Sequence, residues 1–401
     1  MSLEMNTIRL ENVSRRSAIK SLCGMAMGLS HLGTAAQSKP SASLSINPRW
    51  YGFNLLEYFS TDPDWMKYFP YVNDGGFKED DFQWMRDWGF NWVRLPMDYR
   101  FWTSPKDPMQ INEKCVLPID RAIRLGERYG IHINICLHRA PGECCLDQLD
   151  PTLTGIQVTR ERTSVYNDPL ALAAFVNQWT YFAKRYKGIS SDKLSFNLVN
   201  EPRDADTTLS TEEGEREYAR VARAAIRGIR NIDPERLIVT DGYPGADAPI
   251  AELIDTHILQ SCHDYYPIQL THYRCEWARG AGSDRWPPPG WPLKDAKGGI
   301  IANSTSVWEK YRAWGSLAKD GIPIHFGEMG CYKHTPPTVV YAWFDDALDM
   351  IGRLRSGWAL WNFRGPFGIL DTERAGTHYR NWHGHSLDVT LLKLLQNKMK
   401  A

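Results

Sequence analysis

Two glutamates stand at the ends of short apolar runs in this sequence. Glu201 follows Asn200 in the segment FNLVNEP, and Glu328 lies in the segment HFGEMG. A pair of carboxyl groups flanking one bond can cleave a glycoside, because one protonates the leaving oxygen while the other attacks or stabilises the anomeric carbon. The first must hold a proton at working pH and the second must be ionised. The pair therefore predicts acid and base chemistry on a sugar.

Other groups able to bind a ligand stand at the ends of most remaining apolar runs. They are Asn54, Arg94, His138, Asn200, His263, Tyr265 and Trp361. In parallel barrels, catalytic and binding groups project from the carboxyl ends of the strands, so residues far apart in the chain meet at one face. A structural protein has no need for a polar group at nearly every strand end. We interpret this set, together with the two glutamates, as one site.

The elements that must position these residues are eight β-rich apolar runs separated by helical stretches. The runs are 50–56, 90–96, 131–137, 194–200, 236–242, 257–265, 322–328 and 357–363. Their near-continuous apolar character is typical of strands buried on both faces of a parallel sheet. Eight strands alternating with helices predict a single-domain α/β fold, the (β/α)8 TIM barrel. An open doubly wound sheet is the alternative, but it usually needs a glycine-rich loop after the first strand, which GFNLLEYF does not provide.

Capping residues mark the start of two of the helices. Ser210 and Glu213 predict a capping box before the amphipathic stretch 216–230. Asp168 followed by Pro169 predicts a second helix start, with a capping side chain and a proline at the first helical position.

A long segment, 266–300, follows the sixth predicted strand. It is too rich in proline and glycine to predict a helix, and a loop of that length is typically functional. Tryptophans in the predicted loops are candidates for stacking on sugar, and these are Trp102, Trp277, Trp286 and Trp291. Tryptophans on the helical stretches are expected to pack in the core, and these are Trp84, Trp88, Trp179, Trp308 and Trp314.

The N-terminal segment 1–36 has the features of a cleaved bacterial export signal. Arg15 and Arg16 precede a mildly apolar run of small residues that ends in TAAQ, which resembles a twin-arginine signal. An amphipathic first helix is the alternative. We expect a short flexible lead at 37–47, a catalytic domain at 48–395, and export to the periplasm or the cell exterior.

Composition excludes several classes of protein. Lys plus Arg and Asp plus Glu both number 47, so no basic excess suggests nucleic-acid binding. Outside the N-terminal signal no segment has the length of apolar sequence that a membrane span needs. Cys144, Cys145 and Cys275 fall in predicted loops and could form a disulfide. Neither the cysteine spacing nor the histidines at 378–385 indicate a metal site, and we expect no metal and no cofactor.

The motifs together resemble glycoside hydrolase family 5, the cellulase-like retaining β-glycosidases with a large (β/α)8 barrel. Asn200-Glu201-Pro202 is similar to the acid/base motif at the family's fourth strand, and Glu328 matches the nucleophile at the seventh. The flanking matches are Arg94, His138, the His263-Asp264-Tyr265 triplet and Trp361. The resemblance covers residues 48–395, which is nearly all of the expected mature chain.

The resemblance implies a function and a role for each residue. Glu201 would be the acid/base with a raised pKa, and Glu328 the nucleophile, with its pKa lowered by Arg94. The substrate-binding residues would be Asn54, Arg94, His138, Asn200, His263, Tyr265 and Trp361. The implied reaction is retaining hydrolysis of a polysaccharide or oligosaccharide, above all β-1,4-glucan, through a covalent glycosyl-enzyme in a monomer.

Several alternatives stay open at this point. The same carboxyl groups would serve a β-mannanase or an exo-acting β-glucosidase, and exo action would follow if segment 266–300 blocks one end of the groove. A different class is a catalytically silent glycan-binding barrel, although such a protein has no need for both carboxylates. A metal-dependent hydrolase is the remaining alternative.

Overall fold

The computed structural model describes residues 49–72, 76–104, 106–203 and 210–400. The predicted export signal and the whole of the lead that follows it lie outside these ranges. Within them, no helix has the length and apolar character to cross a membrane.

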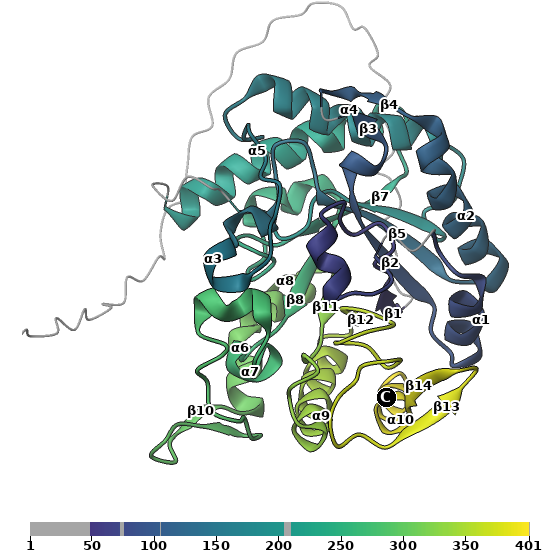
Figure 1. Cartoon of the computed structure of the whole chain (residues 1–401). Coiled ribbons are helices and arrows are strands. Elements are labelled where there is room, and N and C mark those ends of the chain that lie inside the picture. Colours follow the sequence, from purple (N-terminus) through teal and green to yellow (C-terminus); the bar gives the residue numbers. More distant parts are fainter. Residues whose placement is uncertain (1–48, 73–75, 105, 204–209, 401) are drawn as a thin grey trace, which may run out of the picture. The chain divides into compact units, whose positions relative to one another are not determined.

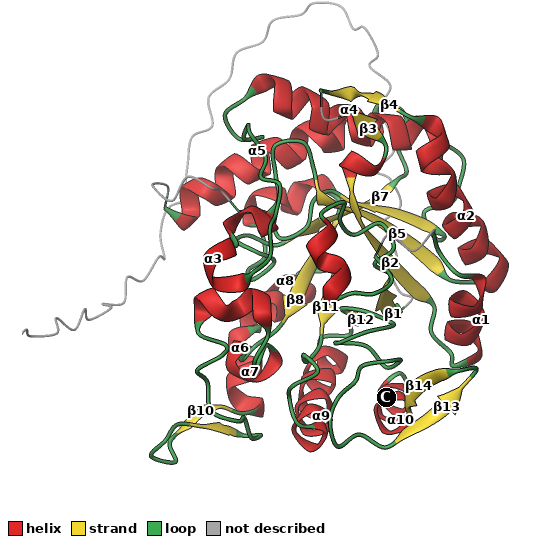
Figure 2. Cartoon of the chain, in the orientation of Figure 1, coloured by secondary structure: helices red, strands yellow, loops and turns green. Residues whose placement is uncertain are grey.

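Eight parallel strands form a closed barrel (Figures 1 and 2). They are β1 (Tyr51–Asn54), β2 (Trp92–Asp98), β5 (His132–Arg139), β6 (Leu194–Asn197), β7 (Leu237–Asp241), β8 (Leu259–Asp264), β11 (Ile324–Met329) and β12 (Gly357–Leu360). Their order around the barrel is β1, β12, β11, β8, β7, β6, β5 and β2, with β2 pairing back to β1. Each corresponds to one of the eight predicted runs, so the predicted (β/α)8 barrel is confirmed.

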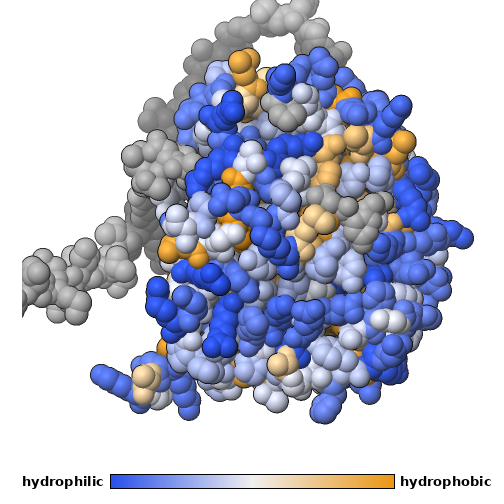
Figure 3. Space-filling view, in the orientation of Figure 1, coloured by the Kyte–Doolittle hydropathy of each residue, from blue (hydrophilic) through white to orange (hydrophobic). Residues whose placement is uncertain are grey.

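Helices lie outside the barrel between successive strands (Figure 2). The longer ones are α1 (Glu79–Asp87), α2 (Glu113–Tyr129), α4 (Pro169–Arg185), α5 (Thr211–Arg230), α7 (Ser304–Lys310), α8 (Arg312–Lys319), α9 (Pro337–Arg353) and α10 (Val389–Lys398). Between β7 and β8 the described chain forms a short 3-10 helix, η4 (Ala251–Thr256), in place of a long helix. Figure 3 shows a largely hydrophilic surface, as expected for helices with one face toward water.

The loops contain short helices and two-stranded hairpins. They are the helices η1 (Pro63–Lys67), η2 (Tyr99–Phe101), η3 (Cys145–Gln148), α3 (Pro151–Thr154), α6 (Ile268–Thr271) and η5 (Glu276–Ala281), and the hairpins β3 (Thr103–Ser104) with β4 (Asp107–Ile111), β9 (Leu293–Lys294) with β10 (Ile300–Ala302), and β13 (Tyr379–Trp382) with β14 (His385–Asp388).

Both predicted helix starts are present. The Ser210 side chain accepts from the backbone N–H of Glu213, whose carboxylate accepts from the backbone N–H of Ser210. The Asp168 carboxylate accepts from the backbone N–H of Leu170, directly after Pro169. These contacts satisfy backbone donors that a helix leaves without partners in its first turn.

Segment 266–300 differs from the prediction because it contains short helices. Two of the residues that disfavour helices lie at the ends of these short helices. Pro267 precedes α6 as its N-cap, and Gly282 follows η5 with a left-handed backbone at φ 93°. Glycine adopts that conformation at little steric cost, so it ends the helix without strain.

The tryptophan and cysteine expectations are partly wrong. Trp102 is buried and donates to the Gln178 amide oxygen at 2.8 Å, so it is a packing residue. Trp308, expected in the core, is 36% exposed.

All seven cysteines among the described residues are free thiols, and the disulfide considered for Cys144, Cys145 and Cys275 does not form. Cys144 and Cys275 are instead buried, where a thiol packs as a small hydrophobe.

The barrel interior changes character from one end to the other. The amino-terminal end is filled by an apolar cluster of Trp50, Trp92, Leu237, Val239, Leu259 and Ala359. Nearer the carboxyl ends of the strands, buried polar and charged groups replace it, among them Arg94, Asn197 and Asp241. The packed floor therefore supports a polar layer that water does not reach, and that layer carries the site.

Candidate active site

Arg94 is the centre of the polar layer. It projects from β2, and its side chain is only 1% exposed. The guanidinium donates to Glu328 Oε1 at 2.6 Å, to Asn54 Oδ1 at 3.0 Å and to Asn200 Oδ1 at 2.8 Å. It also donates to Asn197 Oδ1 at 2.9 Å. A rigid planar group with this many donors fixes the position of every acceptor around it.

Glu328 lies on β11 and is held at both carboxylate oxygens. Oε1 accepts from Arg94, and Oε2 accepts from the Tyr265 hydroxyl at 3.0 Å. The side chain is 4% exposed. Two donors at fixed positions leave this carboxylate one orientation, which a reacting group requires.

Glu201 follows β6 and has an unusual backbone. Its φ is 44°, in the left-handed region that side chains other than glycine rarely adopt. The backbone N–H donates to Asp241 Oδ2 at 3.0 Å, which anchors the turn. Its side chain is 22% exposed, more than that of Glu328. Backbone strain of this kind is concentrated at functional sites, and here it directs the carboxyl group toward the interior of the site.

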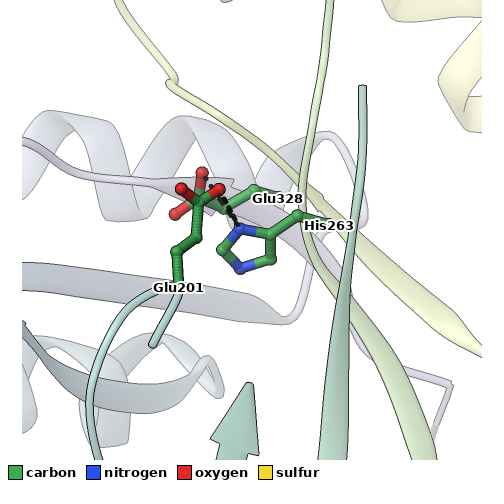
Figure 4. Close-up of side chains that lie close together, drawn as sticks. All are labelled: Glu201, His263 and Glu328. Atoms are coloured by element: carbon green, nitrogen blue, oxygen red, sulfur yellow. Dashed lines mark hydrogen bonds and ion pairs between the residues drawn. The ribbon is translucent and has the colours of Figure 1, made fainter. Parts of the chain in front are cut away.

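His263 on β8 links the two glutamates (Figure 4). Its Nδ1 lies 2.9 Å from Glu201 Oε1 and 3.5 Å from Glu328 Oε2, and its Nε2 lies 3.2 Å from Asp241 Oδ2. Burial lowers the pKa of His263, but the surrounding carboxylates outweigh burial and raise that pKa to about 10. The imidazole therefore holds two protons at neutral pH and carries a positive charge between the acidic groups.

The pKa directions of the two glutamates are the reverse of the expected ones, for two different reasons. Burial raises the pKa of Glu201, but the hydrogen bond and positive charge of His263 outweigh it, so the pKa of Glu201 is lowered. Burial also raises the pKa of Glu328, and it prevails over His263 and Arg94 there. The expectation of a raised pKa on Glu201 and a lowered one on Glu328 was wrong, because it left out the charge of His263 beside Glu201 and the burial of Glu328. The three groups share their protons as one coupled system.

Asp241, at the end of β7, is a site residue that the sequence reasoning missed. It is fully buried, and it contacts Arg94 at 3.4 Å and His263 at 3.2 Å. Burial raises its pKa, but His263 and Arg94 outweigh burial and hold that pKa well below its usual value. The signal was available, because the fifth predicted strand ends in the acidic residue of the segment VTDG. The same strand-end rule that found the other residues applies to it.

The predicted substrate-binding residues fall into two groups. Asn54 and Arg94 are buried behind Glu328, and neither lines the cavity at the barrel mouth. The residues that do line it are His138, Asn200, His263, Tyr265 and Trp361. Asn54 holds Arg94 and donates to the backbone oxygens of Gly327 and Leu360, both at 3.0 Å. Its contacts are those of a positioning residue.

The cavity has a volume of about 900 Å³ and contains both glutamates. Pockets for small ligands have volumes of roughly 300–1,000 Å³. Trp361 forms part of its lining beside Phe59, with ring centroids 5.5 Å apart. Of the tryptophans proposed to stack on sugar, Trp277 lines this cavity, whereas Trp286 and Trp291 do not. Apolar rings near a few polar groups are typical of sugar-binding sites, since the rings stack on the sugar's apolar faces.

Glu201, His263 and Glu328 are also spaced closely enough to share a metal ion, since atoms of all three lie within 4.8 Å of one another. An ion bound there would have to displace the proton that His263 Nδ1 shares with Glu201 Oε1 across 2.9 Å. The expectation that the site works without a metal stays a prediction.

The fold and the site define a parallel barrel with two glutamates at the carboxyl ends of β6 and β11. A family model described as cellulase, glycosyl hydrolase family 5, matches residues 49–365. The chain belongs to this family.

Relatives and solved structures agree with the family. Endoglucanase C of Acetivibrio thermocellus is 27% identical over 207 residues, which cover 51% of this chain and 54% of that protein. Cellodextrinase A of Ruminococcus flavefaciens is 27% identical over 213 residues, covering 51% of this chain and 56% of that protein. The chain thus spans about half the length of the curated relatives it matches.

Two solved structures superpose on most of the described barrel. A structure described as a glycoside hydrolase has a TM-score of 0.76 and 34% identity, covering 88% of this chain and 99% of its own. Thermotoga maritima Cel5A, solved with mannotriose, has a TM-score of 0.63 and 20% identity, and the match covers 87% of this chain and 97% of that one. The second likeness shows the shared fold alone.

Replacing Arg94 by Met should destabilise the protein and abolish its function together. The change leaves Glu328 and Asp241 buried without their cationic partner, which costs about 3–5 kcal/mol in unfolding free energy. Denaturant unfolding measures this loss. Arg236→Met is the matched control for activity. Arg236 is equally buried, but it binds Asp233 and backbone oxygens away from the cavity, so its loss should destabilise the fold and leave the site in place. Equal stability of R94M and the wild type would contradict the account of this network.

Proposed function

We propose that this protein hydrolyses β-1,4-linked glucan with retention of anomeric configuration. The observation that carries the proposal is the pair of glutamates joined by His263 in an aromatic-lined cavity. Retaining glycosidases place their two carboxyl groups about 5–5.5 Å apart, whereas inverting ones need about 6.5–9.5 Å for a water molecule. Oxygens of Glu201 and Glu328 within 4.8 Å of each other support the shorter separation.

In the first step, a Glu328 oxygen attacks the anomeric carbon as the bond to the leaving oxygen breaks. The Tyr265 hydroxyl and Arg94 hold the attacking carboxylate in line, and their contacts are those described above. The leaving oxygen takes a proton from Glu201, which receives it in turn from His263 Nδ1 through their 2.9 Å hydrogen bond. The product of this step is a sugar esterified to Glu328, with Glu201 ionised and His263 neutral.

In the second step, water enters from the side where the leaving group departed. Glu201 takes one proton from the water as its oxygen attacks the anomeric carbon, and the bond to Glu328 breaks. Glu201 then passes this proton back to His263 Nδ1, and the released carboxylate regains its hydrogen bonds from Arg94 and Tyr265. Two displacements at the same carbon restore the starting configuration.

The choice of glucan rests on the surroundings of the glutamates. The relatives named as endoglucanases and a cellodextrinase favour a glucan over a mannan. A net charge of zero suits an uncharged polymer, since no electrostatic steering is required. We also propose that the chain is exported, which its paired Arg15 and Arg16 support and which would bring it to extended polysaccharide.

Removing either glutamate should abolish hydrolysis without unfolding the protein. We expect Glu328→Ala and Glu201→Gln to lower kcat on β-1,4-glucan by a factor on the order of 100–10,000, because each loses a group that acts on the reacting atoms. Glu217→Gln, at a partly exposed site on α5 away from the cavity, is the matched control. Folded variants of both glutamates that turn over at the wild-type rate would refute the assignment.

Rates of the wild-type protein on β-1,4-glucan, glucomannan and laminarin distinguish the glucanase from the alternative β-mannanase and exo-acting β-glucosidase.

The pH dependence should follow His263. Its pKa of about 10 means that the site keeps its transferable proton until the pH rises through that value, where kcat/KM should fall. The variant His263→Gln lacks the positive charge. The basic limb of its kcat/KM profile should lie about 2–3 pH units nearer acid, because Glu201 must then hold the proton by itself. Rates on a chromogenic aryl β-glycoside across the pH range measure the shift. A basic limb that stays in place in this variant would exclude His263 as the proton source.

A further inference from the structure

Three loops above the carboxyl ends of the strands meet one another. They follow β1, β5 and β8 and carry η1, α3 and η5. The backbone N–H of Gln157, after α3, donates to Asp64 Oδ2 on η1 at 2.9 Å, and α3 packs against η5. These three strands are not neighbours in the barrel. The loops therefore reach across the barrel mouth to make these contacts.

Trp277 on η5 completes the ring of contacts. Its ring centroid lies 5.5 Å from that of Trp65 and 5.4 Å from that of Phe69, both in the loop after β1. The ring of Tyr332, which follows β11, also contacts Trp277, with centroids 5.2 Å apart. These residues and Trp361 belong to one apolar cluster, separate from the barrel core. One end of the cavity is thus a wall of packed aromatic rings, which we call the aromatic wall.

The aromatic wall is fixed to the barrel. The backbone N–H of Tyr332 donates to the Thr271 oxygen at 2.7 Å, and its hydroxyl donates to Glu276 Oε2 at 2.5 Å. The Thr335 hydroxyl donates to the Leu270 oxygen at 2.6 Å. Because these bonds tie both sides of the segment 268–276 to the loop after β11, the wall is part of the folded structure.

The cavity has two different sides. The walled side is lined by Phe59, Phe69, His138, Trp277 and Trp361. The other side, in the described part of the chain, is lined by Arg203, Pro244, Gly245, Asp247 and Lys310. The first side is a set of rings, and the second is a polar edge formed by the loops after β6, β7 and β8.

The two glutamates give this asymmetry a direction. Trp361 follows β12 and Glu201 follows β6, and these strands lie on opposite sides of the barrel. The leaving oxygen must contact the acid/base, so the leaving part of the substrate lies toward the polar edge. The sugar that bears the attacked carbon lies on the other side of Glu201, toward Trp361. Any further sugars on its non-reducing side extend into the aromatic wall.

We propose that the cavity is a blind pocket for the non-reducing end of a β-1,4-gluco-oligosaccharide or glucan chain. The wall limits how many sugars fit before the cleaved bond, so the enzyme releases a short unit of fixed length from chain ends. This inference rests on the proposed function and specifies its substrate class. An interior stretch of polymer would need an open groove on both sides of the glutamates.

The test uses two substrates with the wild-type protein. The first is a β-1,4-linked gluco-hexaose with a fluorophore at its reducing end, and the second is a soluble β-1,4-glucan followed by viscosity and by new reducing ends. We expect one short unlabelled product at early times, with the label retained in the complementary fragment. The viscosity should fall slowly relative to the number of bonds cleaved.

Two variants open the pocket at different points. Trp277→Ala removes the central ring of the wall, and Leu153→Ser weakens the contact of α3 with η5 at a side chain that is 47% exposed, which the fold tolerates. Either variant should increase the viscosity loss per bond cleaved several-fold. Trp308→Ala, on the outer helix α7, is the matched control and should behave like the wild type. The Leu153 variant keeps the test informative if the Trp277 variant does not fold.

The outcomes separate the two proposals. A ladder of labelled products from the start, with steep viscosity loss, would overturn the blind pocket and leave the proposed hydrolysis intact. A short product that carries the label would overturn the assigned direction. Wild-type cleavage patterns in both folded variants would overturn the role of the wall. If neither substrate yields any product, the proposed function is refuted, and this inference with it.

Discussion

The structure depends on one buried positive charge, the Arg94 guanidinium. Placing an ion in a protein interior costs several kcal/mol unless partners surround it, and here Glu328, Asp241 and three asparagines do so. The partners come from strands on every side of the barrel. The closed sheet therefore brings them to one point, and the guanidinium makes their burial together tolerable.

A second positive charge then decides how protons are distributed. His263 is raised to a pKa of about 10 by the carboxylates around it, and it lowers the pKa of Glu201 in return. Because Asp241 holds one side of the ring and Glu201 the other, the imidazole is oriented as well as charged. The acid/base function is thus a property of the group of residues, and Glu201 is the member that faces the cavity.

The sequence was sufficient to predict the barrel, because each strand is a compact apolar run and buried parallel strands need no partner-specific signal. Strand-end polar residues were equally visible, and Asp241 lies inside the predicted run 236–242, although it was not included among the expected site residues. The pKa directions could not be predicted, since they depend on how closely His263 approaches two carboxylates from other strands. The aromatic wall was also hidden, because Trp277 meets Trp65 more than 200 positions away in the chain, through loop conformations that local sequence does not specify.

The central claim is that Glu328 forms a covalent bond to the sugar. An activated 2-deoxy-2-fluoro glucoside slows both steps but leaves the second slower, so the intermediate accumulates and mass spectrometry can locate it. We expect one added sugar on the peptide that contains Glu328, and no label in the Glu328→Ala variant. A label on another peptide, or an inverted product with no labelled protein, would contradict it.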